Sequence, residues 1–180
     1  MGTKGRTFSK IRRIKKTVRY VVYTLVILGI TFLLWRYDLE SIPQGYGHLE
    51  PQSMPAGTRV VSISCDANTP LGIGSVIRYA PPSGGGAMTY GVIAGLAGDI
   101  VSFADKNSSA AAMQVAGRPE EIGLPPGHKI PAGAIPDGYF LVLLGDRHLR
   151  SGASHPDSRQ LGLISIDWIK AKIISSLYFL

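Results

Sequence analysis

The feature that most constrains this chain is a stretch of sixteen residues without a charge, Tyr20 to Trp35. A helix over it would rise about 1.5 Å per residue, or roughly 24 Å in all. That is slightly shorter than the roughly 30 Å hydrocarbon core of a bilayer, but Arg19 and Arg36 can extend their charged ends to the two interfaces. The stretch therefore predicts a single membrane-spanning helix and a lipid bilayer as a partner.

The residues before this stretch carry most of the excess positive charge. The formal net charge is +7, and residues 1–19 contain no acid and eight of the 19 Lys and Arg residues: Lys4, Arg6, Lys10, Arg12, Arg13, Lys15, Lys16 and Arg19. The rest of the chain has 11 basic and 12 acidic residues and is close to neutral. Such a one-sided cluster is typical of a cytoplasmic flank, so we expect the part after the helix to cross the membrane. The charge gives no indication of a nucleic-acid partner.

Two other interpretations of the N-terminus fit less well. A cleaved secretory signal has a similar beginning, but the sequence RYDLESIPQGYG after Trp35 offers no Ala-x-Ala-type cleavage site. A buried core helix would leave the basic flank without a purpose. We therefore predict a basic cytoplasmic tail over 1–19, a transmembrane anchor over 20–37 and an extracytoplasmic domain over 38–180. The expected location is the inner (cytoplasmic) membrane, with a single pass and a periplasmic or otherwise extracytoplasmic C-terminal domain.

The outer part consists of short apolar, β-branched runs separated by Gly and Pro clusters, which is typical of strands. Ile169, Ala171 and Ile173 alternate with Lys170 and Lys172, the period of a half-buried strand. The predicted strands are 58–64, 75–80, 91–103, 139–145, 161–166 and 168–179. The predicted fold class is mostly β, an antiparallel domain behind one N-terminal helix.

Several kinds of site have little support in the sequence. The single cysteine, Cys65, cannot form an internal disulfide, and its apolar surroundings suggest a buried small side chain rather than a nucleophile. The glycines at 84–86 lack the Lys-Ser/Thr of a phosphate-binding loop. The four histidines show no metal-ligand spacing. We therefore expect neither a metal nor another cofactor.

Three short motifs follow the anchor in order. The first is SMPAG (53–57), just before a predicted strand, and the second is GLAGD (95–99), a tight turn between two apolar strands. The third begins at Gly145-Asp146, after a buried strand, and continues through a polar loop to Asp157-Ser158-Arg159 and further strands. Each motif is short, and their shared order behind one membrane anchor makes the set specific.

With these motifs the chain resembles the type I signal peptidases, membrane-anchored serine peptidases that use a Ser–Lys dyad. The resemblance covers roughly residues 50–173 and is closest to the branch that processes pilins and other substrates in conjugative transfer. It implies that Ser53 is the nucleophile and that Met54 and Pro55 line the substrate site. It also implies that Asp157, Ser158 and Arg159 support the active-site region, although a buried ion pair without a chemical role would give the same pattern. Ala97 stands where the family's turn has a proline.

The chain departs from the family at the residue that the chemistry needs most. A serine hydroxyl is a weak nucleophile unless a nearby group accepts its proton. The family uses a lysine kept neutral by burial, four residues before the Gly-Leu of the second motif. Here that position is Gly91, and no lysine lies between Lys16 and Lys106. Pro51, two residues before Ser53, also lacks the hydroxyl and N–H that could help to bind an oxyanion.

Three explanations of the missing lysine stay open. His155 could be the base, oriented by Asp157 two residues later, since eukaryotic relatives use histidine. His148, Lys106 and Lys129 are further candidates. Alternatively, the chain is a catalytically inactive relative that keeps the fold. In the third explanation, the lysine position is misplaced or Gly91 is a substitution particular to this chain.

Two functions are consistent with the sequence. The first is a serine endopeptidase that cleaves exported precursors or pilin-like peptides near the outer membrane face, with secretion or conjugation machinery as a partner. The second is a non-catalytic component that binds such peptides or assists assembly. In the first, an acyl-enzyme on Ser53 would be released to water or, in the conjugative branch, to an amine.

Overall fold

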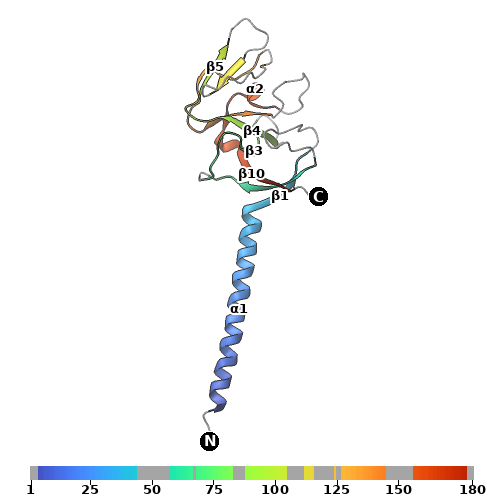
Figure 1. The fold of residues 1–180 in the computed structure, drawn as a ribbon, viewed down its shortest axis with the longest axis vertical. Helices are drawn as coiled ribbons and strands as arrows, with labels where there is room; N and C mark the ends of the chain where they lie inside the picture. The colour runs from blue at the N-terminus through green and yellow to red at the C-terminus, as the bar shows by residue number, and fades with distance from the viewer. Residues whose placement is uncertain are drawn as a thin grey trace. The chain divides into compact units, whose positions relative to one another are not determined.

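The computed structural model describes residues 4–43, 57–66, 68–82, 88–104, 112–115, 124, 127–144 and 156–177. The chain divides into two compact units, Met1–Asp38 and Leu39–Leu180. Figure 1 shows one long helix in the first unit and strands in the second.

The first unit is the helix α1, Lys4–Arg36. Its segment Lys15–Arg36 is long and apolar enough to cross a membrane, with none of the apolar window buried against protein. The hydroxyls of Thr24 and Thr31 donate to the carbonyls of Tyr20 and Ile27, both at 2.9 Å. These polar side chains are thereby satisfied within the helix, as a bilayer requires. The helix ends one residue before the end predicted for the anchor, because Tyr37 begins the first strand.

The second unit is antiparallel and mostly β, as predicted. Its main sheet has seven strands in the order β1-β2-β10-β3-β4-β8-β9. Their bounds are β1 Tyr37–Ser41, β2 Arg59–Ser64, β3 Val76–Tyr79, β4 Thr89–Gly95, β8 Tyr139–Leu143, β9 Ile164–Ser165 and β10 Ile169–Leu177. The predicted alternation in β10 is confirmed, since Ile169, Ala171 and Ile173 are buried whereas Lys170 is exposed and Lys172 half-buried.

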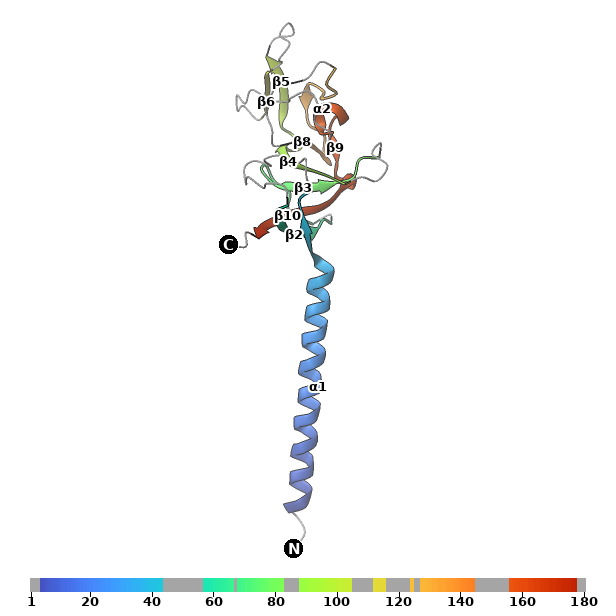
Figure 2. The ribbon, with the colours of Figure 1, turned by 90° about the vertical axis from the view of Figure 1, so that its right-hand side faces the viewer.

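A second sheet has three strands in the order β6-β5-β7. Its strands are β5 Ile100–Ala104, β6 Ala112–Val115 and β7 Gly133–Ala134. Both views place β5 at the end of the β unit that lies away from β1 and β10 (Figures 1 and 2). Buried Val101 and Val115 of this sheet join the β8 residues Leu141 and Leu143 in one core cluster.

The segment predicted as a strand over 161–166 is largely something else. Residues Ser158–Leu161 form the short helix α2, only Ile164–Ser165 is strand, and Ile166–Trp168 is a 3₁₀ turn. Apolar periodicity over six residues cannot distinguish these alternatives. The helix cap distinguishes them. The Asp157 side chain accepts from the N–H of Arg159, and the Gln160 side chain accepts from the N–H of Asp157 at 2.9 Å, which is a capping box.

Candidate functional site

The proposed nucleophile and its neighbours cannot be placed. Ser53, Met54, Pro55 and the candidate base His155 lie outside the described residues. Pro51, Lys106 and His148 do as well. The described parts of the site are therefore the two ends of the segment that contains Ser53, the second motif, and the trio Asp157, Ser158 and Arg159.

The described residues that border the segment with Ser53 are paired with each other. The N–H of Gly57 donates to the carbonyl of Ile42 at 2.8 Å, and the N–H of Ile42 donates to the carbonyl of Thr58 at 2.9 Å. The side chain of Ile42 is 1% exposed and packs with Val60 and Tyr90. The two ends of the segment with Ser53 are thus held together on one face of the main sheet.

The trio of the third motif forms a buried support at the end of β8. Asp157, Ser158 and Arg159 are 0%, 0% and 1% exposed. The Asp157 carboxylate accepts from the Arg159 Nη2 at 2.7 Å and from the Arg159 backbone N–H at 2.8 Å. It also accepts from the backbone N–H of Leu144 at 3.0 Å, while the Ser158 hydroxyl accepts from the N–H of Val142 at 2.9 Å. The carboxylate and the hydroxyl therefore bind backbone donors of β8 and of the residue after it.

The same support also reaches β3. The Tyr79 hydroxyl donates to the carbonyl of Pro156 at 2.9 Å, immediately before Asp157. The N–H of Lys129 donates to the carbonyl of Arg159 at 2.9 Å, and the Lys129 side chain is exposed. Breaking a buried ion pair of this kind leaves an uncompensated charge and costs about 3–5 kcal/mol. The trio holds together β3, β8 and the chain before α2.

The second motif is a tight turn from β4 into β5. Gly98 has a φ of 86°, in the region that favours glycine, and the Asp99 side chain accepts from the N–H of Leu96 at 2.8 Å. A positive φ at the third position matches a type II turn, whose second position accepts proline. That second position is Ala97, so the turn retains its geometry where the resemblance expected a proline.

Gly91 has no room for a side chain. A Cβ built there would lie 2.5 Å from Val142 Cγ1, 3.3 Å from Tyr79 Cε1 and 3.4 Å from the carbonyl oxygen of Leu143. Val142 is fully buried, and its N–H is bound by Ser158. A side chain at this position would therefore require the buried Val142 side chain, or the strand that carries it, to shift.

Gly91 also faces away from Ile42. Its neighbours Tyr79 and Val142 belong to one core cluster, whereas Tyr90 and Val92 pack with Ile42 in another. Successive residues of a strand point to opposite faces, so Tyr90 and Val92 share the face onto which the chain returns at Gly57. A group on β4 that acts near Ile42 must come from position 90 or 92 rather than 91.

On that face lies a cluster that the sequence did not predict. Glu40 of β1 accepts hydrogen bonds through Oε2 from Arg78 Nη1 of β3 and from the Tyr90 hydroxyl of β4, the latter at 2.8 Å. Burial, followed by the hydrogen bond to Glu40, raises the pKa of Tyr90 above its ordinary value. Tyr90 therefore stays a proton donor to Glu40. The sequence signal for this cluster was Arg78 within the apolar segment SVIRYA, because a charged side chain in a buried strand needs a partner.

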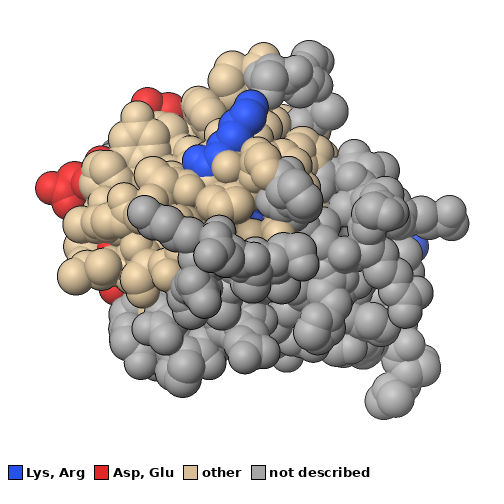
Figure 3. All heavy atoms as spheres, turned by 90° about the horizontal axis from the view of Figure 1, so that it is seen from above, with Lys and Arg blue, Asp and Glu red and all other residues tan. Residues whose placement is uncertain are grey.

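Other chemical groups show no such convergence. Among the described residues, no three His, Cys, Asp or Glu side chains could share a metal ion. Cys65, predicted to be buried, is half-buried and packs against the core cluster around Ile77. On the face that Figure 3 displays, the described Lys and Arg side chains are few and separated.

Comparison with known proteins adds no family assignment. No protein-family model matches the chain, and no curated protein does either.

Proposed function

We propose that this chain is a membrane-anchored serine endopeptidase of the signal-peptidase type, with Ser53 as its nucleophile. The observation that supports this most strongly is the buried trio Asp157, Ser158 and Arg159, which fixes the end of β8 beside β4. The resemblance assigns a supporting role to the same trio. The tight turn with a positive φ at Gly98 gives further support, since the second motif falls there.

The reaction would begin with attack of the Ser53 hydroxyl on a peptide carbonyl that follows a small side chain. An acyl-enzyme forms as the amine leaves, and water then releases it. The substrate would lie extended beside Met54 and Pro55, so that its backbone pairs with a strand. Exported precursors and pilin-like peptides are the proposed substrates, with secretion or conjugation machinery supplying them.

The anchor would give this reaction its location. The basic residues 4–19 remain on the cytoplasmic side by the positive-inside rule, which places the β unit on the outer side. A substrate held in the same membrane is present at a high effective concentration. A cysteine introduced at exposed Ser102, in a Cys65→Ala background, tests the orientation. Labelling of intact spheroplasts by an impermeant maleimide is expected, and labelling only after lysis would reverse the topology.

A catalytically inactive homologue is the second candidate, and the geometry at Gly91 favours it. The family's lysine position carries no side chain, and Val142 occupies the space that a Cβ would need. In this case the β unit would bind signal-like peptides or assist an active partner. Function would then survive Ser53→Ala and be lost when a bulky substitution at Met54 blocks the peptide site.

The experiment that separates the two candidates is cleavage of a membrane-tethered precursor by the purified full chain in proteoliposomes. The variants are the unchanged chain, Ser53→Ala and the control Ser102→Ala, which removes an exposed hydroxyl on β5. Cleavage by the unchanged chain and by Ser102→Ala, with loss in Ser53→Ala, is expected. Cleavage that persists in Ser53→Ala removes Ser53 from the mechanism. Tight binding of the precursor by an unchanged chain that does not cleave it supports the inactive homologue.

A further inference from the structure

The cations next to the uncharged stretch of α1 lie on one side of the helix. Successive residues of a helix are about 100° apart, so Lys15, Lys16 and Arg19 fall within an arc of about 100°. Tyr20 and Tyr23 lie within or beside this arc and widen it to about 140°. We call these five residues the basic–aromatic stripe. The rest of the circumference over residues 15–24 is uncharged and consists of Thr17, Val18, Val21, Val22 and Thr24.

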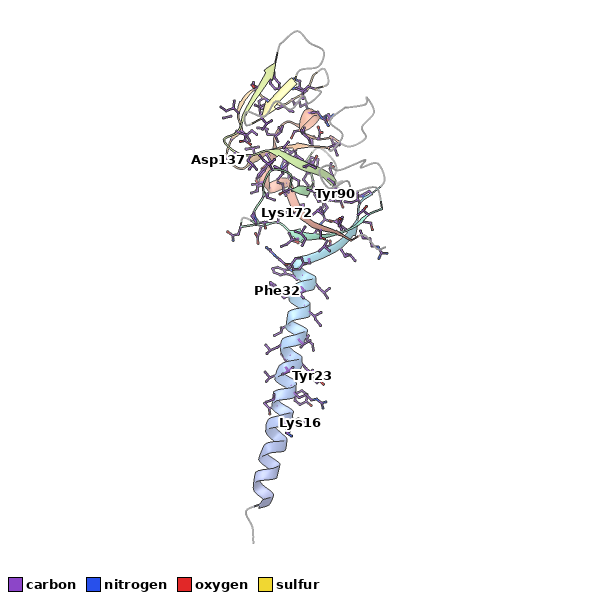
Figure 4. All side chains as sticks on the ribbon, in the orientation of Figure 1. Lys16, Tyr23, Phe32, Tyr90, Asp137 and Lys172 are labelled. Atoms are coloured by element: carbon purple, nitrogen blue, oxygen red, sulfur yellow. The ribbon has the colours of Figure 1, made fainter. Side chains whose placement is uncertain are left out.

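The tyrosine rings of the stripe lie against two of its cations. Lys16 Nζ is 6.0 Å from the centroid of the Tyr20 ring, and Arg19 Cζ is 5.9 Å from the centroid of the Tyr23 ring. Both distances are within the reach of a cation–π contact, and both pairs have the spacing of four residues that places side chains on one face. Figure 4 shows Lys16, Tyr23 and Phe32 in this order along α1. The cations and the rings therefore form one continuous surface.

No carboxylate of the helix neutralises this surface. The sequence contains no Asp or Glu before Asp38, and α1 ends at Arg36. The side chains of Lys15, Lys16 and Arg19 are all exposed. Five further Lys and Arg residues precede them in 4–14. The anions that balance the stripe must therefore come from outside α1.

The donors of the stripe match the phosphate of an anionic lipid. A guanidinium can bind two phosphate oxygens through parallel hydrogen bonds, and an ammonium adds a compact positive charge. Tyrosine places its ring in the apolar layer and its hydroxyl among the headgroups. Toward the C-terminal end, the same arc continues with exposed apolar side chains at Val26, Ile27 and Ile30. An acyl chain along this continuation would bring its own headgroup to the stripe.

The position of the stripe favours a lipid over a soluble polyanion such as nucleic acid. Arg19 is adjacent to the uncharged stretch Tyr20–Trp35, and none of the apolar window of this helix is buried against protein. A bilayer around the stretch brings lipid headgroups to the level of the stripe, whereas a soluble polyanion would have to enter the headgroup layer. Membrane orientation depends on the number of positive charges beside a span and does not require them on one face. The one-sided arrangement therefore indicates a binding surface.

We propose that the basic–aromatic stripe is a binding site for an anionic phospholipid at the N-terminal end of the membrane-spanning segment. Lys16 and Arg19, oriented by the tyrosine rings, bind the lipid phosphate, and Lys15 adds a third positive charge. The site enriches anionic lipid around the anchor. The proposal requires α1 to lie across a membrane, and it does not depend on the peptidase function.

The test is native mass spectrometry of the full chain in detergent micelles, which identifies the lipids that remain bound. Equal amounts of phosphatidylglycerol and phosphatidylcholine with distinguishable masses are added, and the ratio of the bound lipids gives the preference. Each Lys or Arg near a headgroup contributes roughly a fivefold preference for an anionic lipid. The three cations therefore predict a preference for phosphatidylglycerol of at least about tenfold, decreasing as the salt concentration rises.

Two variants with the same loss of charge separate the stripe from the basic segment as a whole. The stripe variant combines Lys15→Gln, Lys16→Gln and Arg19→Gln and should lower the preference to less than about threefold. The control variant removes the same charge farther from the uncharged stretch and should retain at least about half of the preference. It combines Lys4→Gln, Arg6→Gln and Lys10→Gln.

A third variant keeps the charge and breaks the stripe. Lys16→Thr with Thr17→Lys, and Val18→Arg with Arg19→Val, move two cations by about 100° in opposite directions around the helix. Both ring contacts are lost, and the preference should fall at least about threefold. Replacing the rings alone, by Tyr20→Leu and Tyr23→Leu, should lower it about two- to fivefold. Circular dichroism establishes that α1 is helical in each variant.

The results decide between a defined site and diffuse charge. Loss of the preference in the stripe variant and in the rearranged variant, with retention in the control, supports the site. Equal losses in the stripe variant and the control, or an unchanged preference after rearrangement, would overturn it. The site is also overturned if the unchanged chain shows no preference for phosphatidylglycerol. An RNA oligonucleotide that displaces the lipid at equal phosphate concentration would assign the stripe to a soluble polyanion instead.

Discussion

Two buried carboxylates of the β unit, Asp157 and Glu40, each pair with an arginine but differ in how fully they are bonded. Both oxygens of Asp157 accept hydrogen bonds, from the Arg159 side chain and from two backbone N–H groups. Glu40 uses Oε2 for both of its described donors and leaves Oε1 buried without one. Asp157 therefore has donors at both oxygens from one short segment and the residue after β8, whereas Glu40 joins β1 to β3 and β4 through one oxygen. The sequence motif pointed to the first carboxylate, and only the structure revealed the second.

The largest expected effect concerns Asp157, both of whose carboxylate oxygens accept hydrogen bonds. Asp157→Asn leaves the Arg159 guanidinium, 1% exposed, without its counter-charge and should lower the free energy of unfolding by about 3–5 kcal/mol. The measurement is urea unfolding of the full chain in detergent, followed by the fluorescence of half-buried Trp168. Exposed Asp137→Asn is the control and should change the value by less than about 0.5 kcal/mol. An equally small change in Asp157→Asn would contradict a supporting role for the ion pair.

The next effect concerns Gly91 in β4. Gly91→Ala places a Cβ 2.5 Å from Val142 Cγ1 and should destabilise the chain by about 1–3 kcal/mol. Gly72→Ala is the control, since a Cβ there meets nothing within 4 Å. In the background of Val142→Ala, which removes the blocking methyl, Gly91→Ala should cost less. Equal costs in the two backgrounds would show that Val142 is not what excludes a side chain from position 91.

A smaller effect is expected from removing the Tyr90 hydroxyl, which is one of the two described donors to Glu40. Tyr90→Phe loses a hydrogen bond to Glu40 and should cost about 0.5–1.5 kcal/mol at neutral pH. The raised pKa of Tyr90 means that the folded state holds its proton more tightly than the unfolded state. Its contribution is therefore complete below about pH 10 and decreases as the pH rises above that value. Stability should fall more steeply above pH 10 in the unchanged chain than in Tyr90→Phe, and identical slopes would contradict the shift.

The smallest effect tests the fold without touching either carboxylate. Ala97→Pro restores the proline that the resemblance expected at the second position of the Leu96–Asp99 turn. Because a type II turn has a φ near −60° there, the substitution should stabilise the chain by about 0.4–1 kcal/mol. Destabilisation would mean that the turn is of another type. A change in Ser53 reactivity would mean that the turn influences the site after all.

Much of the fold follows from local patterns. The apolar stretch before Trp35 determines a helix long enough to span a bilayer, because its composition excludes other solutions over that length. The alternation along β10 gave the buried positions Ile169, Ala171 and Ile173 correctly. The Asp157-Ser158-Arg159 motif singled out from the sequence is fully buried, and the strand predicted over 161–166 is largely something else. Short apolar runs there fit a strand and a capped turn of helix equally well, and only the Asp157–Gln160 capping bonds distinguish them.

The candidate site needed contacts between distant parts of the chain. Glu40 is 38 residues from Arg78 and 50 from Tyr90, and no local pattern connects them. The resemblance placed a lysine at position 91, and only the packing of β4 against β8 shows that the Val142 side chain lies where a Cβ on Gly91 would be. By itself the sequence determined the apolar N-terminal helix, the β class and the motif positions, since these depend on composition and short spacing. The tertiary structure decided which core each β4 residue joins and which strands Glu40 links, because both depend on strands that meet only in the folded sheet.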